Sequence, residues 1–111
     1  MAGNFAPTRK KPAFATRVVS RLKQVPRGRL ATYRSLAAAA GCPGAARAVG
    51  NVLAQNRQLL KIPRHRIVRS DGLAGGYRLG QKRKIEILRQ EGIRFGLRGK
   101  ILNFKKILHK F

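Results

Sequence analysis

Apolar residues recur at helical spacing near the start of the chain. One apolar face is formed by Phe14, Val18, Leu22 and Val25. These positions lie four, four and three residues apart, which is the spacing of one side of an α-helix. We therefore expect a helix that begins at Ala13, and Pro26 and Gly28 are expected to end it.

Two further helices are predicted on either side of a short turn. Thr32 offers an N-cap hydroxyl for a helix over Tyr33–Ala40. The turn Gly41-Cys42-Pro43-Gly44 separates it from a second helix over Ala45–Gln55. Two helices joined by a tight turn that contains glycine are typical of a helix-turn-helix, whose second helix enters a DNA groove. An ordinary packed helical hairpin is the alternative.

The second half of the chain predicts one short strand and two more helices. Residues 66–69 form a strand candidate, and the glycines that follow indicate a loop or wing. A helix over Leu79–Glu91 should stop at Gly92. The basic tail 94–111 has an apolar stripe of Ile101, Phe104, Leu108 and Phe111, which favours an amphipathic helix that covers the core.

These elements indicate a mainly α (α+β) fold. We expect a single winged helix-turn-helix domain with a short β-hairpin wing. The expected organisation is a basic flexible arm over 1–12, the domain over 13–93 and the amphipathic tail over 94–111.

The charge of the chain narrows the class of partner. It has 26 Lys and Arg against 3 Asp and Glu, a formal net charge of +23. Such an excess attracts polyanions, so nucleic acid is favoured over an anionic membrane surface or mere solubility. A hydrophobic content of 43% is too high for a disordered chain.

The single cysteine and the lack of long apolar segments argue against several other classes of protein. Cys42 is the only cysteine, so neither a disulfide within the chain nor a cysteine zinc cluster can form. No signal peptide or membrane-spanning segment is evident. We expect an intracellular monomer without a metal or cofactor.

The most informative segment is Ile62–Val68, with the sequence IPRHRIV. Considered alone it is a basic patch with one histidine, His65, and a lone histidine is usually structural.

Taken with other motifs, this segment resembles part of a known family. The matching pieces are Thr32–Ala37, Ala45–Gly50, Asn56, Pro63-x-His65-Arg66-Ile67-Val68 and Glu91-Gly92. In this order and spacing they resemble the C-terminal, DNA-binding domain of O6-alkylguanine-DNA alkyltransferases, over residues 14–92. The separate N-terminal domain that many members carry is not expected.

The resemblance implies an alkyl-transfer reaction, and this chain lacks the side chain that accepts the alkyl group. Members flip an alkylated guanine out of the duplex, and the cysteine of a Pro-Cys-His-Arg motif takes the alkyl group. A histidine and a glutamate, here His65 and Glu91, draw off the thiol proton. Arg64 stands at the cysteine position, and a guanidinium has no lone pair available for an alkyl group. Cys42 aligns with the turn between two helices, so it is no substitute.

The chain is therefore expected not to be an enzyme. It is similar to the alkyltransferase-like proteins, which bind alkylated DNA and pass the lesion to other repair factors, notably nucleotide excision repair. Members of that group commonly have tryptophan or alanine where Arg64 stands. One alternative is a residual or engineered-inactive O6-methylguanine-DNA methyltransferase. The other is a general architectural or chromatin DNA-binding protein.

The resemblance also implies the site residues. The expected DNA-binding residues are Tyr33, Ala46, Arg47, Ala48, Gly50 and Asn51. The expected lesion pocket consists of Tyr33, Asn56, Pro63, Arg64, His65, Tyr77 and Arg78. Each has a simpler alternative, such as a phosphate contact for Arg47 or a core aromatic for Tyr33. Arg64 either reads the acceptor edge of guanine or reaches a phosphate.

Overall fold

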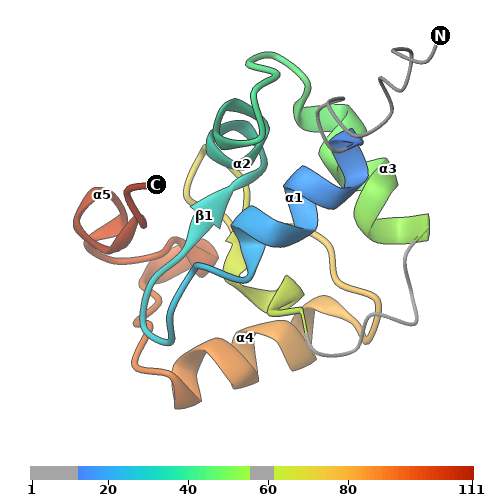
Figure 1. Ribbon diagram of the computed structural model, residues 1–111. Coiled ribbons are helices and arrows are strands. Elements are labelled where there is room, and N and C mark those ends of the chain that lie inside the picture. Colours follow the sequence, from blue (N-terminus) through green and yellow to red (C-terminus); the bar gives the residue numbers. More distant parts are fainter. Residues whose placement is uncertain (1–12, 56–61) are drawn as a thin grey trace, which may run out of the picture.

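The computed structural model describes residues 13–55 and 62–111 and is mainly helical, with one small sheet (Figure 1). Its α-helices are α1 (Phe14–Leu22), α2 (Tyr33–Ala39), α3 (Ala46–Gln55), α4 (Gln81–Gln90) and α5 (Phe104–Ile107). Two 3-10 helices are present, η2 (Arg64–Arg66) and η3 (Leu97–Gly99). The strands β1 (Ala31–Thr32) and β2 (Ile67–Val68) pair in parallel.

The predicted helix-turn-helix arrangement is present in α2 and α3. The Thr32 side chain accepts a hydrogen bond from the Ser35 backbone at 2.8 Å, and the Ser35 hydroxyl accepts one from the Thr32 N–H at 2.9 Å. This capping box fixes the start of α2. Gly41 and Gly44 adopt positive φ values of 88° and 89°, which glycine tolerates best and which the tight turn to α3 requires.

The two short strands lie between two apolar cores. Ala31 and Ile67 face a first core built with α1, α2 and α3, which includes Val18, Leu22, Leu36, Val49 and Leu53. Leu30 and Val68 face a second core with Leu88, Ile93 and Ile101. Neighbouring residues of an extended chain point to opposite faces, so each short segment contributes to both cores. The helices α1–α3 therefore lie on one side and α4 on the other (Figure 1).

The first helix is shorter than the pattern predicts. It ends at Leu22, and Val25 is buried in the turn that follows. The fourth helix also begins two residues later than expected, at Gln81, but Gly92 does follow its end with a φ of 93°.

The prediction of a β-hairpin wing after the second strand is wrong for the described residues. The partner of Ile67–Val68 is Ala31–Thr32, in parallel. The chain turns after Arg69, whose N–H donates to the Leu73 carbonyl at 3.0 Å, and continues as an irregular loop. The physical reason is that the carbonyls of Ala74 and Gly76 accept from Lys84, so a partner strand is not needed to satisfy them.

The predicted amphipathic helix in the tail is also largely wrong. Of its apolar stripe, Ile101, Phe104 and Leu108 pack in the second core, but Phe111 is exposed. Only Phe104–Ile107 is α-helical. The chain then extends, and the Leu30 N–H donates to the Ile107 carbonyl at 2.9 Å while the His109 N–H donates to the Leu30 carbonyl at 2.7 Å. These bonds satisfy buried backbone groups that a continuing helix would leave unpaired. None of the helices among the described residues has the length and apolar character needed to span a bilayer.

Candidate functional site

Helix α3 presents a polar outer face above a buried inner one. Val49 and Leu53 are buried against the first core. Arg47 and Asn51, four residues apart and therefore on one side of the helix, are exposed. Ala46 and Ala48 are half-buried. The outer face thus offers a cation and an amide flanked by small side chains, as a helix that approaches a nucleic-acid backbone requires.

Gly50 leaves open space on the same helix. A Cβ added there would meet no atom within 4 Å. Packing within the protein therefore does not require glycine, and glycine inside a helix is less stable than alanine. The residue is explained better by a ligand that approaches the helix closely.

A cavity of about 300 Å³ opens beside α3 and is the main candidate site in the described structure. Its lining comes from α2, α3, η2, β2 and the loop before α4: Tyr33, Gly50, Leu53, Ala54, Arg64, Ile67, Gly76, Tyr77 and Arg78. This volume is at the small end of the range for ligand pockets and suits a single base. Five predicted site residues, Tyr33, Gly50, Arg64, Tyr77 and Arg78, are brought together here.

Other predicted site residues do not line the cavity. Pro63 caps η2, the turn that carries Arg64 and His65, but neither Pro63 nor His65 is part of the lining. Ala46, Arg47, Ala48 and Asn51 lie along α3 outside it. Asn56 lies outside the described residues.

The Arg64 side chain lines the cavity wall, and two of its donors lack a hydrogen-bond partner in the part of the chain that the structure describes. These donors are the buried atoms Nε and Nη2. Burial first, and the charge of Arg78 second, lower the pKa of Arg64, while Tyr77 acts in the opposite direction. A guanidinium remains protonated in proteins, so the wall carries a cation with unused donors.

Tyr33 lines the same cavity at the start of α2. Burial raises the pKa of its hydroxyl, which therefore remains a neutral donor at physiological pH.

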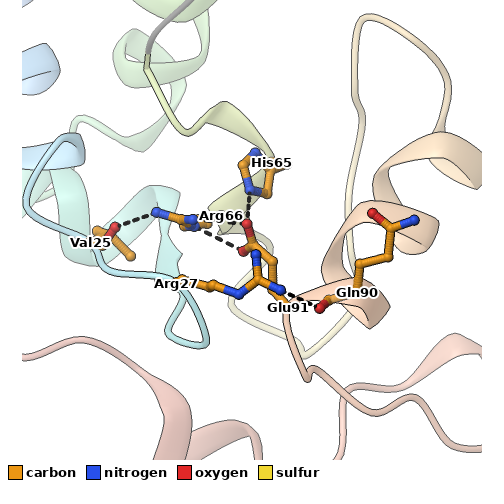
Figure 2. Close-up of polar contacts among 6 residues, drawn as sticks. All are labelled: Val25, Arg27, His65, Arg66, Gln90 and Glu91. Carbon is orange, nitrogen blue, oxygen red and sulfur yellow. Dashed lines mark hydrogen bonds and ion pairs between the residues drawn. The ribbon is translucent and has the colours of Figure 1, made fainter.

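Next to η2, Glu91 holds the side chains of His65 and Arg66 (Figure 2). Arg66 donates through Nε to Oε1 at 2.9 Å and through Nη2 to Oε2 at 2.8 Å. His65 Nε2 lies 2.8 Å from Oε2. Burial acts to raise the pKa of Glu91, but the hydrogen bonds from Arg66 and His65 outweigh it and hold the pKa below its ordinary value. The carboxylate therefore stays ionised and fixes both side chains.

A buried cation needs an anion nearby, and Glu91 belongs to the same family motif as the half-buried Arg64. Glu91 instead pairs with Arg66, whose Nη1 also donates to the Val25 carbonyl at 3.0 Å (Figure 2). Arg66 was not predicted as a site residue. Its paired hydrogen bonds to Glu91 join residues 25 positions apart, so they leave no local pattern in the sequence.

Lys84 is a second residue that sequence reasoning missed. Its side chain is fully buried, and Nζ donates to the carbonyls of Ile67 at 2.6 Å, Gly76 at 3.1 Å and Ala74. Burial lowers the pKa of Lys84 to about 8. The three bonds tie the loop that carries Tyr77 and Arg78 to β2. A signal was present, since Lys84 lies one turn before Leu88 on the buried face of α4.

Cys42 lies apart from the cavity. It is half-buried in the turn between α2 and α3, and Arg17 Nη2 approaches its Sγ at 3.7 Å. Within residues 13–55 and 62–111, no group of three His, Cys, Asp or Glu side chains gathers where it could hold a metal ion.

Comparison with known proteins gives consistent matches over this region. The family model for the 6-O-methylguanine DNA methyltransferase DNA-binding domain matches residues 13–93. The bifunctional transcriptional activator/DNA repair enzyme Ada of Escherichia coli is 44% identical over 79 residues, which are 71% of this chain and 22% of Ada. The methylated-DNA–protein-cysteine methyltransferase of Rattus norvegicus is 41% identical over 92 residues, 81% of this chain and 44% of that protein.

A solved structure covers more of the chain. It is that of S. pombe Atl1 in complex with damaged DNA containing O6-carboxymethylguanine, with a TM-score of 0.74 and 26% identity. The match covers 88% of this chain and 95% of Atl1, whereas the chain spans less than half the length of the two enzymes above. The helical fold, its parallel strand pair and the motif order agree with these matches, and the chain belongs to the 6-O-methylguanine DNA methyltransferase family through its DNA-binding domain.

Proposed function

We propose that this chain recognises O6-alkylguanine in duplex DNA by taking the flipped nucleotide into the cavity, without removing the alkyl group. The observation that carries the proposal is the cavity beside α3, whose wall holds Arg64 where the family has its acceptor cysteine. A base must leave the stack before a pocket of this kind can read it. Arg64 supplies hydrogen-bond donors but no nucleophile.

The remaining roles are those that the family resemblance implies for each residue. Arg47, exposed on α3, fills the space that the flipped base leaves in the stack. Tyr33 helps to rotate the phosphate, and Asn56, which lies outside the described residues, keeps the bracing role that the family resemblance implies. The loop with Tyr77 and Arg78 acts as the wing of a winged helix and closes the cavity wall.

Arg64 reads the guanine itself in this proposal. O6 and N7 of guanine are both acceptors, and the planar fork of arginine is their usual partner. The buried, unpartnered Nε and Nη2 of Arg64 are suited to such acceptors. Pro63 and His65 position the turn η2 that carries the guanidinium.

The partners in the proposal are double-stranded DNA with an O6-alkylguanine and, after binding, nucleotide excision repair proteins. The chain acts inside the cell as a monomer, with no membrane or cofactor.

Paired binding and transfer assays test this function against its rivals. Matched duplexes with guanine or a single O6-methylguanine are titrated at one fixed salt concentration, because phosphate contacts make affinity depend on salt. Lesion preference without methyl transfer is the expected result. Equal affinity for both duplexes would favour an architectural DNA-binding protein, and methyl transfer would favour a surviving methyltransferase.

Gly50→Ala should raise stability and weaken DNA binding. Open space at the Cβ position and helix propensity together predict a gain of about 0.5–1 kcal/mol in the free energy of unfolding. The same methyl group would occupy the space reserved for DNA. Denaturant unfolding and duplex titration measure the two effects, and an unchanged affinity in a stabilised variant would contradict the close approach of DNA to α3.

Arg47→Ala should reduce base flipping and affinity for lesion DNA, because the gap in the stack is no longer filled. A fluorescent base analogue at the lesion reports flipping directly. Lys105→Ala removes an exposed cation on α5, away from the cavity, and is the control that should leave the flipping signal intact. A normal signal in Arg47→Ala would mean that Arg47 contacts only phosphate.

A further inference from the structure

Two cations share the cavity wall, and no acid opposes them. Arg64 and Arg78 both line the cavity of about 300 Å³, close enough for the charge of Arg78 to affect the pKa of Arg64. The chain has only three acids in its full sequence, and none of them is a lining residue. Each acid pairs elsewhere: Asp71 with Arg69 at 2.7 Å, Glu86 with Arg83 at 3.6 Å, and Glu91 with Arg66 and His65 at 2.8 Å.

The burial of two guanidinium nitrogens of the half-buried Arg64 makes this imbalance costly. Buried polar groups in proteins are nearly always paired, and a buried cation needs an anion or a set of acceptors. The Nε and Nη2 atoms of Arg64 have neither among the described residues. Guanine can offer neutral acceptors to these atoms, but neutral acceptors leave the charges of Arg64 and Arg78 uncompensated. A full negative charge in the cavity would compensate them.

We propose that the cavity selects O6 substituents that carry a carboxylate, such as carboxymethyl, over neutral alkyl groups, with Arg64 and Arg78 as the specificity-determining residues. This inference rests on the proposed function, since the substituent must enter the cavity on a flipped guanine. The carboxylate is ionised at neutral pH and forms charge-assisted hydrogen bonds with the guanidinium groups.

Phosphates of the DNA backbone are the other source of negative charge for these arginines. The two sources differ in what they predict. A phosphate is present in every duplex, so contacts with it raise affinity for all duplexes alike. A carboxylate on the lesion raises affinity only for the duplex that contains it.

The test uses four duplexes that differ at one base: guanine, O6-methylguanine, O6-carboxymethylguanine and its neutral amide analogue, O6-carbamoylmethylguanine. The amide matches the carboxylate in shape. The ratio of the affinities for these two duplexes therefore measures the effect of the negative charge alone. The parent chain should bind the carboxylate at least about tenfold more tightly than the amide, the strength expected of a hydrogen bond to a charged group.

Variants assign the preference to the two arginines. Arg64→Gln and the exposed Arg78→Gln should each reduce the carboxylate-to-amide ratio several-fold, and the double variant should bring it close to one. Lys105→Gln removes one exposed charge on α5, away from the cavity, and should leave the ratio unchanged.

The outcomes separate this inference from the proposed function. Equal binding of carboxylate and amide by the parent chain would overturn the inference, even if O6-methylguanine is still preferred over guanine. An equal loss by both Arg64→Gln and Arg78→Gln on all four duplexes would also overturn it, because both arginines would then contact phosphate and not the lesion. Equal binding of guanine and O6-methylguanine would instead count against the proposed function.

Discussion

Arg64→Cys is expected to accept one methyl group per molecule from O6-methylguanine in duplex DNA, whereas the parent chain accepts none. The variant rebuilds Pro-Cys-His-Arg at the cavity wall, with His65 already held by Glu91 at 2.8 Å. The thiolate is the nucleophile that the parent lacks. The new sulfur–methyl bond forms as the bond between O6 and the methyl carbon breaks, and the thiol proton passes in net to the released guanine. Mass spectrometry of the protein measures the transfer.

Two controls make this result specific to the site. Arg64→Ser has a side chain of similar size but a poor nucleophile, so it should bind the lesion and transfer nothing. Arg64→Cys combined with His65→Gln should transfer more slowly, because the thiol proton has lost its acceptor. Methylation of Cys42 in the parent, or a folded Arg64→Cys that binds lesion DNA and never transfers, would contradict the assignment of Arg64 to the acceptor position.

Glu91→Gln is expected to cause the largest loss of stability. Glu91 has a side chain only 7% exposed, and it accepts two hydrogen bonds from Arg66 and pairs with His65. The variant leaves Arg66 largely buried without its anion and places an amide N–H₂ opposite one of its donors. Because one partner of a buried ion pair is removed, the free energy of unfolding should fall by about 3 kcal/mol. Denaturant unfolding at neutral pH measures it.

The matched control is Glu86→Gln on α4, whose carboxylate is exposed and lies 3.6 Å from Arg83. An exposed pair of this kind contributes little, so the change should stay within about 0.5 kcal/mol. Similar losses in both variants would mean that the Glu91 pairing does not stabilise the fold.

Acid sensitivity should depend on the same carboxylate. Because the folded pKa of Glu91 is lowered, its contribution is complete above its ordinary value of 4.5 and is lost as the pH falls through the lowered pKa. The parent chain should therefore lose stability below about pH 4.5, and Glu91→Gln should lose less over the same range. The pKa of Asp71 is also lowered, by the Leu73 backbone N–H and by Arg69, so Asp71 accounts for part of the stability that Glu91→Gln still loses in acid.

The elements that could be predicted from sequence are those fixed by local signals. The hydroxyl of Thr32 and the glycines of the 41–44 turn define α2, α3 and the connection between them. The family motif predicts that Arg64 and Tyr77 belong to one pocket, and both residues line the cavity beside α3.

The features that could not be predicted depend on contacts between distant parts of the chain. The Ile67–Val68 strand has no local pattern that would reveal Ala31–Thr32 as its parallel partner. Lys84 lies on the buried side of α4, one turn before Leu88, but no local pattern shows that it donates to the loop carbonyls in place of a hairpin partner. In the tail, helical spacing is overridden because Leu30 needs backbone partners from Ile107 and His109.

Recovery of the bound complex tests most directly whether the chain recognises the lesion without repairing it. The parent chain is mixed with equal amounts of labelled duplex containing guanine or O6-methylguanine, and the retained DNA and protein are both analysed by mass spectrometry. The account predicts enrichment of the lesion duplex, with the methyl group still on guanine and the protein mass unchanged. Retention of both duplexes in equal amounts, or a protein heavier by one methyl group, would contradict it.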